Sequence, residues 1–358
     1  MVAADSMVPR SVGLLGAGVI GAGWAARFLL AGANVQLYDP SPAAADSVAA
    51  TLANARRAWR SLTPAPLPRE GSLTIASSIA EAVAGADFVQ ESAPERETVK
   101  ADLLAQASAA ARADAIIASS TSGLLPSRIA AAIIHPERFV VGHPFNPVYL
   151  LPLVEVCGGE RTSPDSVAQA ANIYRAVWMR PLVVRREIDG FIADRLLEAL
   201  WREALWLIAD DVATAEEIDD AIRFAAGLRW AAMGTFLTYR LGGGGDMRHF
   251  MAQFGPALQL PWSRLTDVPE LDDALLDKIV SQSDAQAGER SVSDLQQIRD
   301  DCLVAVLQGL AAVGFGAGEV VASAERELFR RAAAGGRNED RASPPSPTAA
   351  PLRDDRRT

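Results

Sequence analysis

The feature that most restricts the fold of this chain is a glycine-rich loop placed between an apolar run and a helical pattern. The run Val12–Leu15 is followed at once by GAGVIG at 16–21, and a helix-forming sequence, GWAARFLLAG at 23–32, starts at the end of this loop. In such a loop Gly16 permits a tight turn, Gly18 lets a ligand approach the backbone, and Gly21 lets helix and strand pack closely. The pattern predicts a strand–turn–helix unit whose helix start faces a phosphate.

Short β-prone runs alternate with Ala-rich stretches of helical length as far as residue 184. After the first run they lie at 35–38, 88–90, 115–119, 139–141, 153–156 and 182–184. This alternation predicts βαβ units, and runs that are apolar throughout predict a largely parallel sheet covered on both faces. We therefore expect an α/β fold with a doubly wound, mainly parallel sheet of the Rossmann type.

Beyond Asp189-Gly190 the pattern becomes helical. The sequence FIADRLLEALWREALWLIA at 191–209 is apolar nearly all round, which predicts a helix buried on most of its circumference and favours a dimer. Helical patterns continue at 214–226, 272–286 and 294–313, before Gly, Pro, Ser and charged residues take over. We expect a Rossmann-type domain at 1–187, an all-helical substrate and dimerisation domain at 188–332, and a disordered tail at 333–358.

Composition narrows the range of partners. The net charge of −10, without a basic block, argues against nucleic acid or an anionic membrane as a general partner. Charged residues interrupt every apolar stretch before the roughly 18 residues that a membrane span needs. Cys157 and Cys302 lie far apart and form neither a disulfide framework nor a metal cluster, and the first ten residues lack an apolar core. These features predict a cytoplasmic protein without a metal site.

An acidic residue identifies the expected nucleotide. Asp39 closes the second predicted strand, 21 residues past Gly18, where a carboxylate accepts hydrogen bonds from ribose hydroxyls and repels a 2′-phosphate. Pro40 follows, and no adjacent Arg is present to bind such a phosphate. The sequence therefore predicts an NAD site, with NAD favoured over NADP. The residues assigned to its loop are Gly16, Ala17, Gly18, Val19, Ile20 and Gly21.

A histidine and a glutamate suggest the chemistry. His143 follows the predicted strand at 139–141, and Glu155 interrupts the apolar strand at 153–156. A carboxylate in a buried run is costly unless a partner satisfies it, and an imidazole is the obvious partner. The carboxylate would fix the tautomer of His143 and leave its second nitrogen free as a general base for alcohol oxidation by NAD. A purely structural His–Glu pair is the alternative.

A hydroxyl-rich segment, SSTSG at 119–123, ends another predicted strand at the carboxyl edge where open α/β sheets bind ligands. Ser122 could hydrogen-bond the substrate hydroxyl or the developing alkoxide. It could equally cap the helix that begins near Pro126. Both interpretations remain open from the sequence.

Taken together, these motifs resemble the 3-hydroxyacyl-CoA dehydrogenase family over essentially all of residues 11–320. The matching pieces are GAGVIG at 16–21, Asp39, ESAPERETVK at 91–100, SSTSG at 119–123, HPFNPV at 143–148, LVEV at 153–156 and GFIADRLL at 190–197. The resemblance implies a Rossmann-type domain followed by an all-helical, dimer-forming domain. It implies catalytic roles for His143 and Glu155, a substrate contact for Ser122, and a cofactor cleft lined by Glu95 and Lys100. An exposed helix turn is the alternative for the last two.

One departure bears on the substrate. The family usually places Asn where this chain has Asp194, and an ionised Asp cannot donate a hydrogen bond to a thioester carbonyl. The strings at 227–244 and 247–262 are similar to those of members that oxidise the 3-hydroxyl of L-carnitine, a small acid with a trimethylammonium group. A quaternary ammonium is held by aromatic faces and a carboxylate. The candidate substrate-binding residues are Asp194 or Glu198 for the negative charge beside the ammonium group, and Trp230, Phe236 and Tyr239 for the aromatic faces. Arg229, Arg240 or Arg248 are the candidates for binding the substrate carboxylate.

Other interpretations of the same residues do not require this substrate. The aromatic side chains could be core and dimer contacts, and Asp194 could belong to the polar stripe of its helix. The same chemistry could act on a 3-hydroxyacyl-CoA, such as 3-hydroxybutyryl-CoA, or on a gulonate-type acid. A non-enzymatic NAD-binding protein is a third hypothesis.

Overall fold

The computed structural model describes residues 8–232, 234–242, 250, 262–264, 270 and 272–339. Its first part is built on an eight-stranded sheet with the order β3-β2-β1-β4-β5-β6-β7-β8. All neighbouring strands are parallel except β6 and β7, which are antiparallel. The strands are β1 (Ser11–Leu15), β2 (Asn34–Tyr38), β3 (Leu73–Ile75), β4 (Phe88–Glu91), β5 (Ile116–Ser119), β6 (Phe139–Pro144), β7 (Leu153–Gly158) and β8 (Arg180–Val184).

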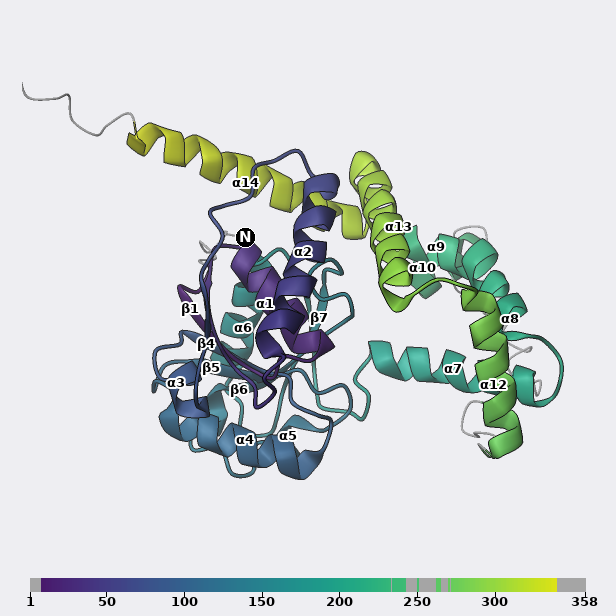
Figure 1. Ribbon diagram of the computed structural model, residues 1–358, viewed down its shortest axis with the longest axis horizontal. Helices are drawn as coiled ribbons and strands as arrows, with labels where there is room; N and C mark the ends of the chain where they lie inside the picture. Colours follow the sequence, from purple (N-terminus) through teal and green to yellow (C-terminus); the bar gives the residue numbers. More distant parts are fainter. Residues whose placement is uncertain are drawn as a thin grey trace, which may run out of the picture.

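Helices cover both faces of this sheet (Figure 1). They are α1 (Val19–Leu30), α2 (Ala44–Leu62), α3 (Ile79–Val83), α4 (Glu97–Ala110), α5 (Pro126–Ile129) and α6 (Pro164–Ala176), with a 3₁₀ turn η1 at Pro136–Arg138. One hydrophobic core joins the sheet to α1, α2 and α6, and a second joins it to α3, α4 and α5. The strand order reverses between β1 and β4, the point at which such sheets bind ligands at their carboxyl ends.

The predicted Rossmann-type fold class is thus confirmed, with one strand that the sequence did not reveal. The missed strand, β3, has three residues, of which Thr74 and Ile75 are exposed. A short, half-exposed edge strand carries little of the apolar signal by which buried strands are recognised.

The second part of the chain is helical in the described residues. It contains α7 (Ala193–Ala209), α8 (Ala215–Ala221), a π-helical turn η2 (Ile222–Ala226), α9 (Gly227–Ala232), α10 (Gly234–Gly242), α12 (Asp273–Ala287), α13 (Val292–Val313) and α14 (Ala317–Glu339). The expected burial of α7 was wrong for the chain by itself, since its only buried residues are Leu205 and Ile208. Leu196 and Trp201 are 66% and 55% exposed, so the described elements of the chain leave these two side chains largely uncovered.

The last two helices return to the sheet domain. Val304 and Leu307 of α13 and Val321, Ala324 and Leu328 of α14 join the same core as α1 and α2, and Figure 1 shows α14 crossing beside α2. The segment predicted to be disordered from residue 333 is helical as far as Glu339, where α14 ends. Residues 340–358 lie outside the described part of the chain. No single described helix is long and apolar enough to cross a membrane, and only the bent pair 293–313 with 317–334 reaches that length together.

A buried polar cluster fastens α13 to the segment between β6 and β7. The fully buried carboxylate of Asp300 accepts a hydrogen bond from the Tyr149 hydroxyl and two from Arg299, at 3.1 and 2.9 Å. Arg57 of α2 lies 3.8 Å from the same carboxylate. Burial and the hydrogen bond to Asp300 raise the pKa of Tyr149, so its hydroxyl stays a donor.

Tyr149→Phe is expected to lower the free energy of unfolding by about 1–3 kcal/mol, because Asp300 loses a hydrogen bond that water cannot replace. Urea denaturation measures the change. Tyr38→Phe is the matched control, since the Tyr38 hydroxyl makes no hydrogen bond within the described residues; its effect should stay within about 0.5 kcal/mol. Equal losses in the two variants would contradict the role assigned to the cluster.

Candidate functional site

The glycine loop connects β1 to α1 and leaves space at its centre. Gly16 has φ of 103°, a left-handed conformation that favours glycine. A Cβ on Gly21 would meet the Gly16 carbonyl oxygen at 1.9 Å, whereas one on Gly18 would meet no atom within 4 Å. No side chain caps the start of α1, so its first N–H groups point at this open space. A pyrophosphate fits there, as the sequence predicted.

Asp39 is held against the same loop. It follows β2, and its carboxylate accepts a hydrogen bond from Ala17 N at 2.6 Å and another from Ser41 N at 2.7 Å. These bonds fix the carboxylate beside the loop, where a carboxylate meets the ribose of a dinucleotide. The loop and Asp39 together therefore fit NAD.

His143 and Glu155 face each other across the antiparallel pair β6–β7. They occupy directly opposite positions in the register, and Nδ1 of His143 lies 3.1 Å from Oε2 of Glu155. His143 is 5% exposed and Glu155 is fully buried. Directly opposite residues on one face of a sheet are close enough for their side chains to interact. The carboxylate consequently fixes the imidazole ring and leaves Nε2 on the open side.

Glu155 has a second function that sequence reasoning missed. Its other oxygen, Oε1, accepts hydrogen bonds from the backbone N–H groups of Ile192 and Ala193, both at 3.0 Å. These groups belong to the start of α7, whose positive dipole end favours an anion. The buried carboxylate therefore has partners on both oxygens and joins the imidazole to the helical part of the chain.

Asp194 lies beside the free nitrogen of the imidazole. Its Oδ2 is 3.6 Å from Nε2 of His143, and its side chain is 27% exposed. Burial raises the pKa of Asp194, with further contributions from Glu155, Glu198 and Glu95, although His143 acts in the opposite direction. Glu198, the alternative acidic residue, is 58% exposed and lies 3.9 Å from Arg202.

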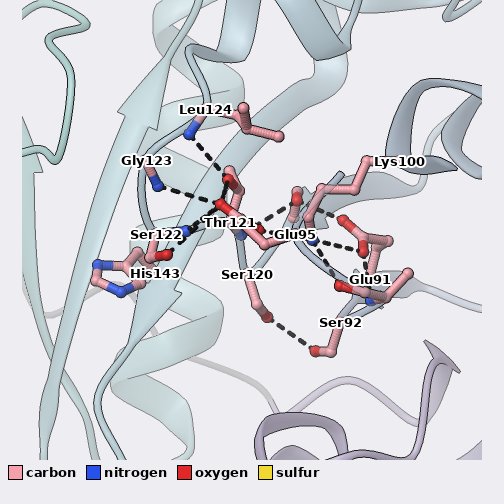
Figure 2. Close-up of polar contacts among 12 residues, drawn as sticks. Glu91, Ser92, Glu95, Lys100, Ser120, Thr121, Ser122, Gly123, Leu124 and His143 are labelled. Atoms are coloured by element: carbon pink, nitrogen blue, oxygen red, sulfur yellow. Dashed lines mark hydrogen bonds and ion pairs between the residues drawn. The ribbon is translucent and has the colours of Figure 1, made fainter. Parts of the chain in front are cut away.

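The SSTSG segment after β5 is organised around Glu95. Glu95 Oε1 accepts hydrogen bonds from the Thr121 hydroxyl, from Ser122 N at 3.0 Å and from Gly123 N at 3.2 Å (Figure 2). Burial alone would raise the pKa of Glu95, but the Thr121 hydrogen bond and the charge of Lys100 outweigh it and lower the pKa. The structure contradicts the alternative in which Ser122 caps the following helix: Leu125 is the N-cap of α5, and no side chain caps that helix.

Lys100 connects the two glutamates of this segment. Its Nζ lies 2.9 Å from Glu91 Oε1 and 3.3 Å from Glu95 Oε2. Lys100 and Glu91 are both buried, so the alternative of an exposed helix turn was wrong for Lys100, whereas Glu95 is 42% exposed. Glu91 also accepts a hydrogen bond from the Ser119 hydroxyl. The network holds the ends of β4 and β5 together beside the glycine loop.

Sequence reasoning missed Glu91, Ser119, Thr121 and Arg27. The first three carried a signal, because polar side chains ended two neighbouring apolar runs. Arg27 carried one too, as a single charge within the apolar sequence of α1. It is fully buried, and its guanidinium donates to the carbonyls of Val148, Leu151 and Val177. Burial lowers the pKa of Arg27 to about 9. Arg27 thus anchors the segment that follows His143.

The predicted aromatic substrate residues are not brought to His143 within one chain. Trp230 lies on α9, Phe236 and Tyr239 lie on α10, and Figure 1 shows both helices well away from β6 and β7. All three side chains are exposed, by 39%, 80% and 49%. Arg240 is also on α10, but its side chain, Arg248 and most of the string at 247–262 lie outside the described residues. Within the described residues, no group of three or more His, Cys, Asp or Glu could hold a metal ion.

Comparison with known proteins gives a consistent result. Residues 11–188 match the model of the 3-hydroxyacyl-CoA dehydrogenase NAD binding domain, and residues 190–274 match that family's C-terminal domain. A Pseudomonas aeruginosa protein named L-carnitine dehydrogenase is 59% identical over 299 residues, which cover 83% of this chain and 93% of that protein. A Mesorhizobium japonicum protein of the same name is 53% identical over 325 residues, 89% of each chain.

A solved structure shares most of the architecture. It is that of 5-formyl-3-hydroxy-2-methylpyridine 4-carboxylic acid 5-dehydrogenase, described as an NAD⁺-dependent dismutase. The two proteins are 30% identical, with a TM-score of 0.70 over 85% of this chain and 99% of the other.

Proposed function

Because the chain belongs to the 3-hydroxyacyl-CoA dehydrogenase family, we propose that it oxidises the 3-hydroxyl of L-carnitine to 3-dehydrocarnitine with NAD. Residues 11–188 are the family's NAD-binding domain. The observation that carries the chemistry is the buried His143–Glu155 pair at 3.1 Å, at the carboxyl edge of the sheet that also carries the glycine loop. The substrate assignment is supported by the names of relatives that are 53% and 59% identical to this chain.

The proposed mechanism assigns one task to each residue. Nε2 of His143 removes the hydroxyl proton of the substrate, while Glu155 holds the ring through Nδ1 and stabilises the imidazolium that forms. Ser122, in the loop after β5, hydrogen-bonds the substrate oxygen as its negative charge develops. Glu95 and Lys100 shape the cofactor side of the site. NAD, when bound, accepts the hydride from the carbinol carbon.

Part of this proposal concerns the whole assembly. The exposed apolar face of α7 supports a homodimer, because exposed apolar patches of this kind mark protein contacts. Of the predicted substrate residues, Asp194 is the one whose described side chain lies at the site of its own chain; we assign the aromatic side chains of α9 and α10 to the dimer surface. Both cysteines are free, which fits a reducing cytoplasm.

A panel of hydroxy acids tests the function. With NAD at mildly alkaline pH, the purified protein should form NADH with L-carnitine, with kcat/KM at least about tenfold above that for 3-hydroxybutyryl-CoA or gulonate, a difference of ~1.4 kcal/mol. NADP in place of NAD should give much slower turnover, because Asp39 repels the 2′-phosphate. A preference for the acyl-CoA or for gulonate would overturn the assignment of L-carnitine as the substrate. NAD binding without turnover of any hydroxy acid would overturn the proposal that the protein is an enzyme.

A further inference from the structure

Asp194 lies where its charge acts directly on a substrate bound at His143. The Nδ1 side of His143 is closed by Glu155, so the substrate hydroxyl must approach Nε2. The Asp194 carboxylate is 3.6 Å from that nitrogen and partly open to solvent. A substrate substituent that points from the carbinol carbon toward Asp194 therefore meets a carboxylate.

The surroundings of Asp194 strengthen the preference for a cation. Glu155, Glu198 and Glu95 all act on the Asp194 carboxylate as negative charges. The Lys100 ammonium group is paired with Glu91 and Glu95. A cationic group placed beside Asp194 is attracted by several carboxylates, whereas an anionic group is repelled by them.

The carbinol carbon of carnitine bears a hydrogen, a hydroxyl, an ammonium arm and a carboxylate arm. Proton removal fixes the hydroxyl at His143, and hydride transfer fixes the hydrogen toward the nicotinamide. Two positions then remain for two arms of opposite charge. Exchanging the arms produces the other enantiomer, so a charge that selects one arm also selects one enantiomer.

We propose that Asp194 binds the quaternary ammonium arm of the substrate and thereby determines which enantiomer is oxidised. The inference rests on the proposed function and adds a specificity-determining residue to it. Aromatic faces are not required at this point, since a carboxylate beside the carbinol suffices to distinguish the two arms. The carboxylate arm lies on the side away from α7.

The test separates the effect of the charge of Asp194 from the effect of its size. Asp194→Asn keeps the size of the side chain and removes its charge. Its kcat/KM for L-carnitine should fall at least about tenfold (~1.4 kcal/mol), mainly through KM. The value for 3-hydroxy-5,5-dimethylhexanoate, in which carbon replaces the ammonium nitrogen, should stay within about threefold. The preference for L- over D-carnitine, taken from kcat/KM or from inhibition constants, should also fall at least about tenfold.

Three further variants complete the design. Glu216→Gln removes the same charge from the exposed surface of α8 and should leave both substrates unaffected. Asp194→Glu keeps the charge and should retain the preference for the cation over its neutral isostere, so a folding defect in Asp194→Asn cannot imitate the result. Glu198→Gln should have a smaller effect on L-carnitine than Asp194→Asn, because Arg202 already lies beside Glu198.

The outcomes separate this inference from the proposed function. Equal losses on L-carnitine and on the isostere would overturn it, because they would show that Asp194 only positions His143. A larger loss of activity on L-carnitine in Glu198→Gln than in Asp194→Asn would also overturn the inference, because it would assign the ammonium-binding charge to Glu198. A wild-type protein that oxidises other hydroxy acids but not carnitine would reject the proposed function, and the inference with it.

Discussion

His143→Gln is expected to lower kcat on L-carnitine by at least about 10²-fold, the usual contribution of a positioned general base. Gln has no group that can take the hydroxyl proton, while the glycine loop and Asp39 stay intact. Steady-state NADH formation measures kcat, and fluorescence titration measures NAD binding, which should change less than about threefold.

His135→Gln is the matched control. His135 is 45% exposed and lies 3.3 Å from Glu137 at the surface, so its loss should leave kcat unchanged. Near-normal turnover by His143→Gln would make the assignment of the base untenable. A parallel loss of NAD binding would point to a misfolded site instead of a missing base.

Glu155→Gln is expected to have the second large effect, a fall in kcat that approaches about 10⁴-fold, the scale seen when an amide replaces the acid that orients a catalytic histidine. The amide oxygen can still accept the N–H groups of Ile192 and Ala193. Its NH₂ then faces Nδ1 of His143, which must become an acceptor, so the ring carries its proton on Nε2 and cannot take another from the substrate.

Glu155→Ala separates orientation from folding. It also removes the acceptor for the start of α7, so it should lower the thermal midpoint more than Glu155→Gln does. If Glu155→Gln kept kcat within tenfold of wild type, the pair would be structural only. If both variants melted at the same temperature, the bond to α7 would carry no stability.

The parts of the fold that follow from local pattern were predictable, and those that depend on distant contacts were not. Seven of the eight strands lie at apolar runs, because burial on both faces requires such runs. The packing of α13 and α14 on α2 joins residues more than 240 positions apart, as in the bond from Gln308 to the Ser61 carbonyl. The end of α14 was also missed: ion pairs of Glu327 with Arg330 and Arg331 support a helix that then continues through Gly335-Gly336.

The same distinction holds at the site. The pairing of His143 with Glu155 was predictable, because a buried carboxylate in a strand needs a partner. The bonds from Glu155 to Ile192 and Ala193 were not, since they depend on where the chain returns some 37 residues later. The resemblance also suggested aromatic residues for the substrate without giving their position, and the fold places those residues on α9 and α10, away from His143.

The double attachment of Glu155 has a mechanical consequence. One oxygen of this buried carboxylate holds the base and the other holds the first turn of α7, so the carboxylate links the imidazole directly to the start of the helical part. Any displacement of the first turn of α7 would therefore pull on the group that orients His143.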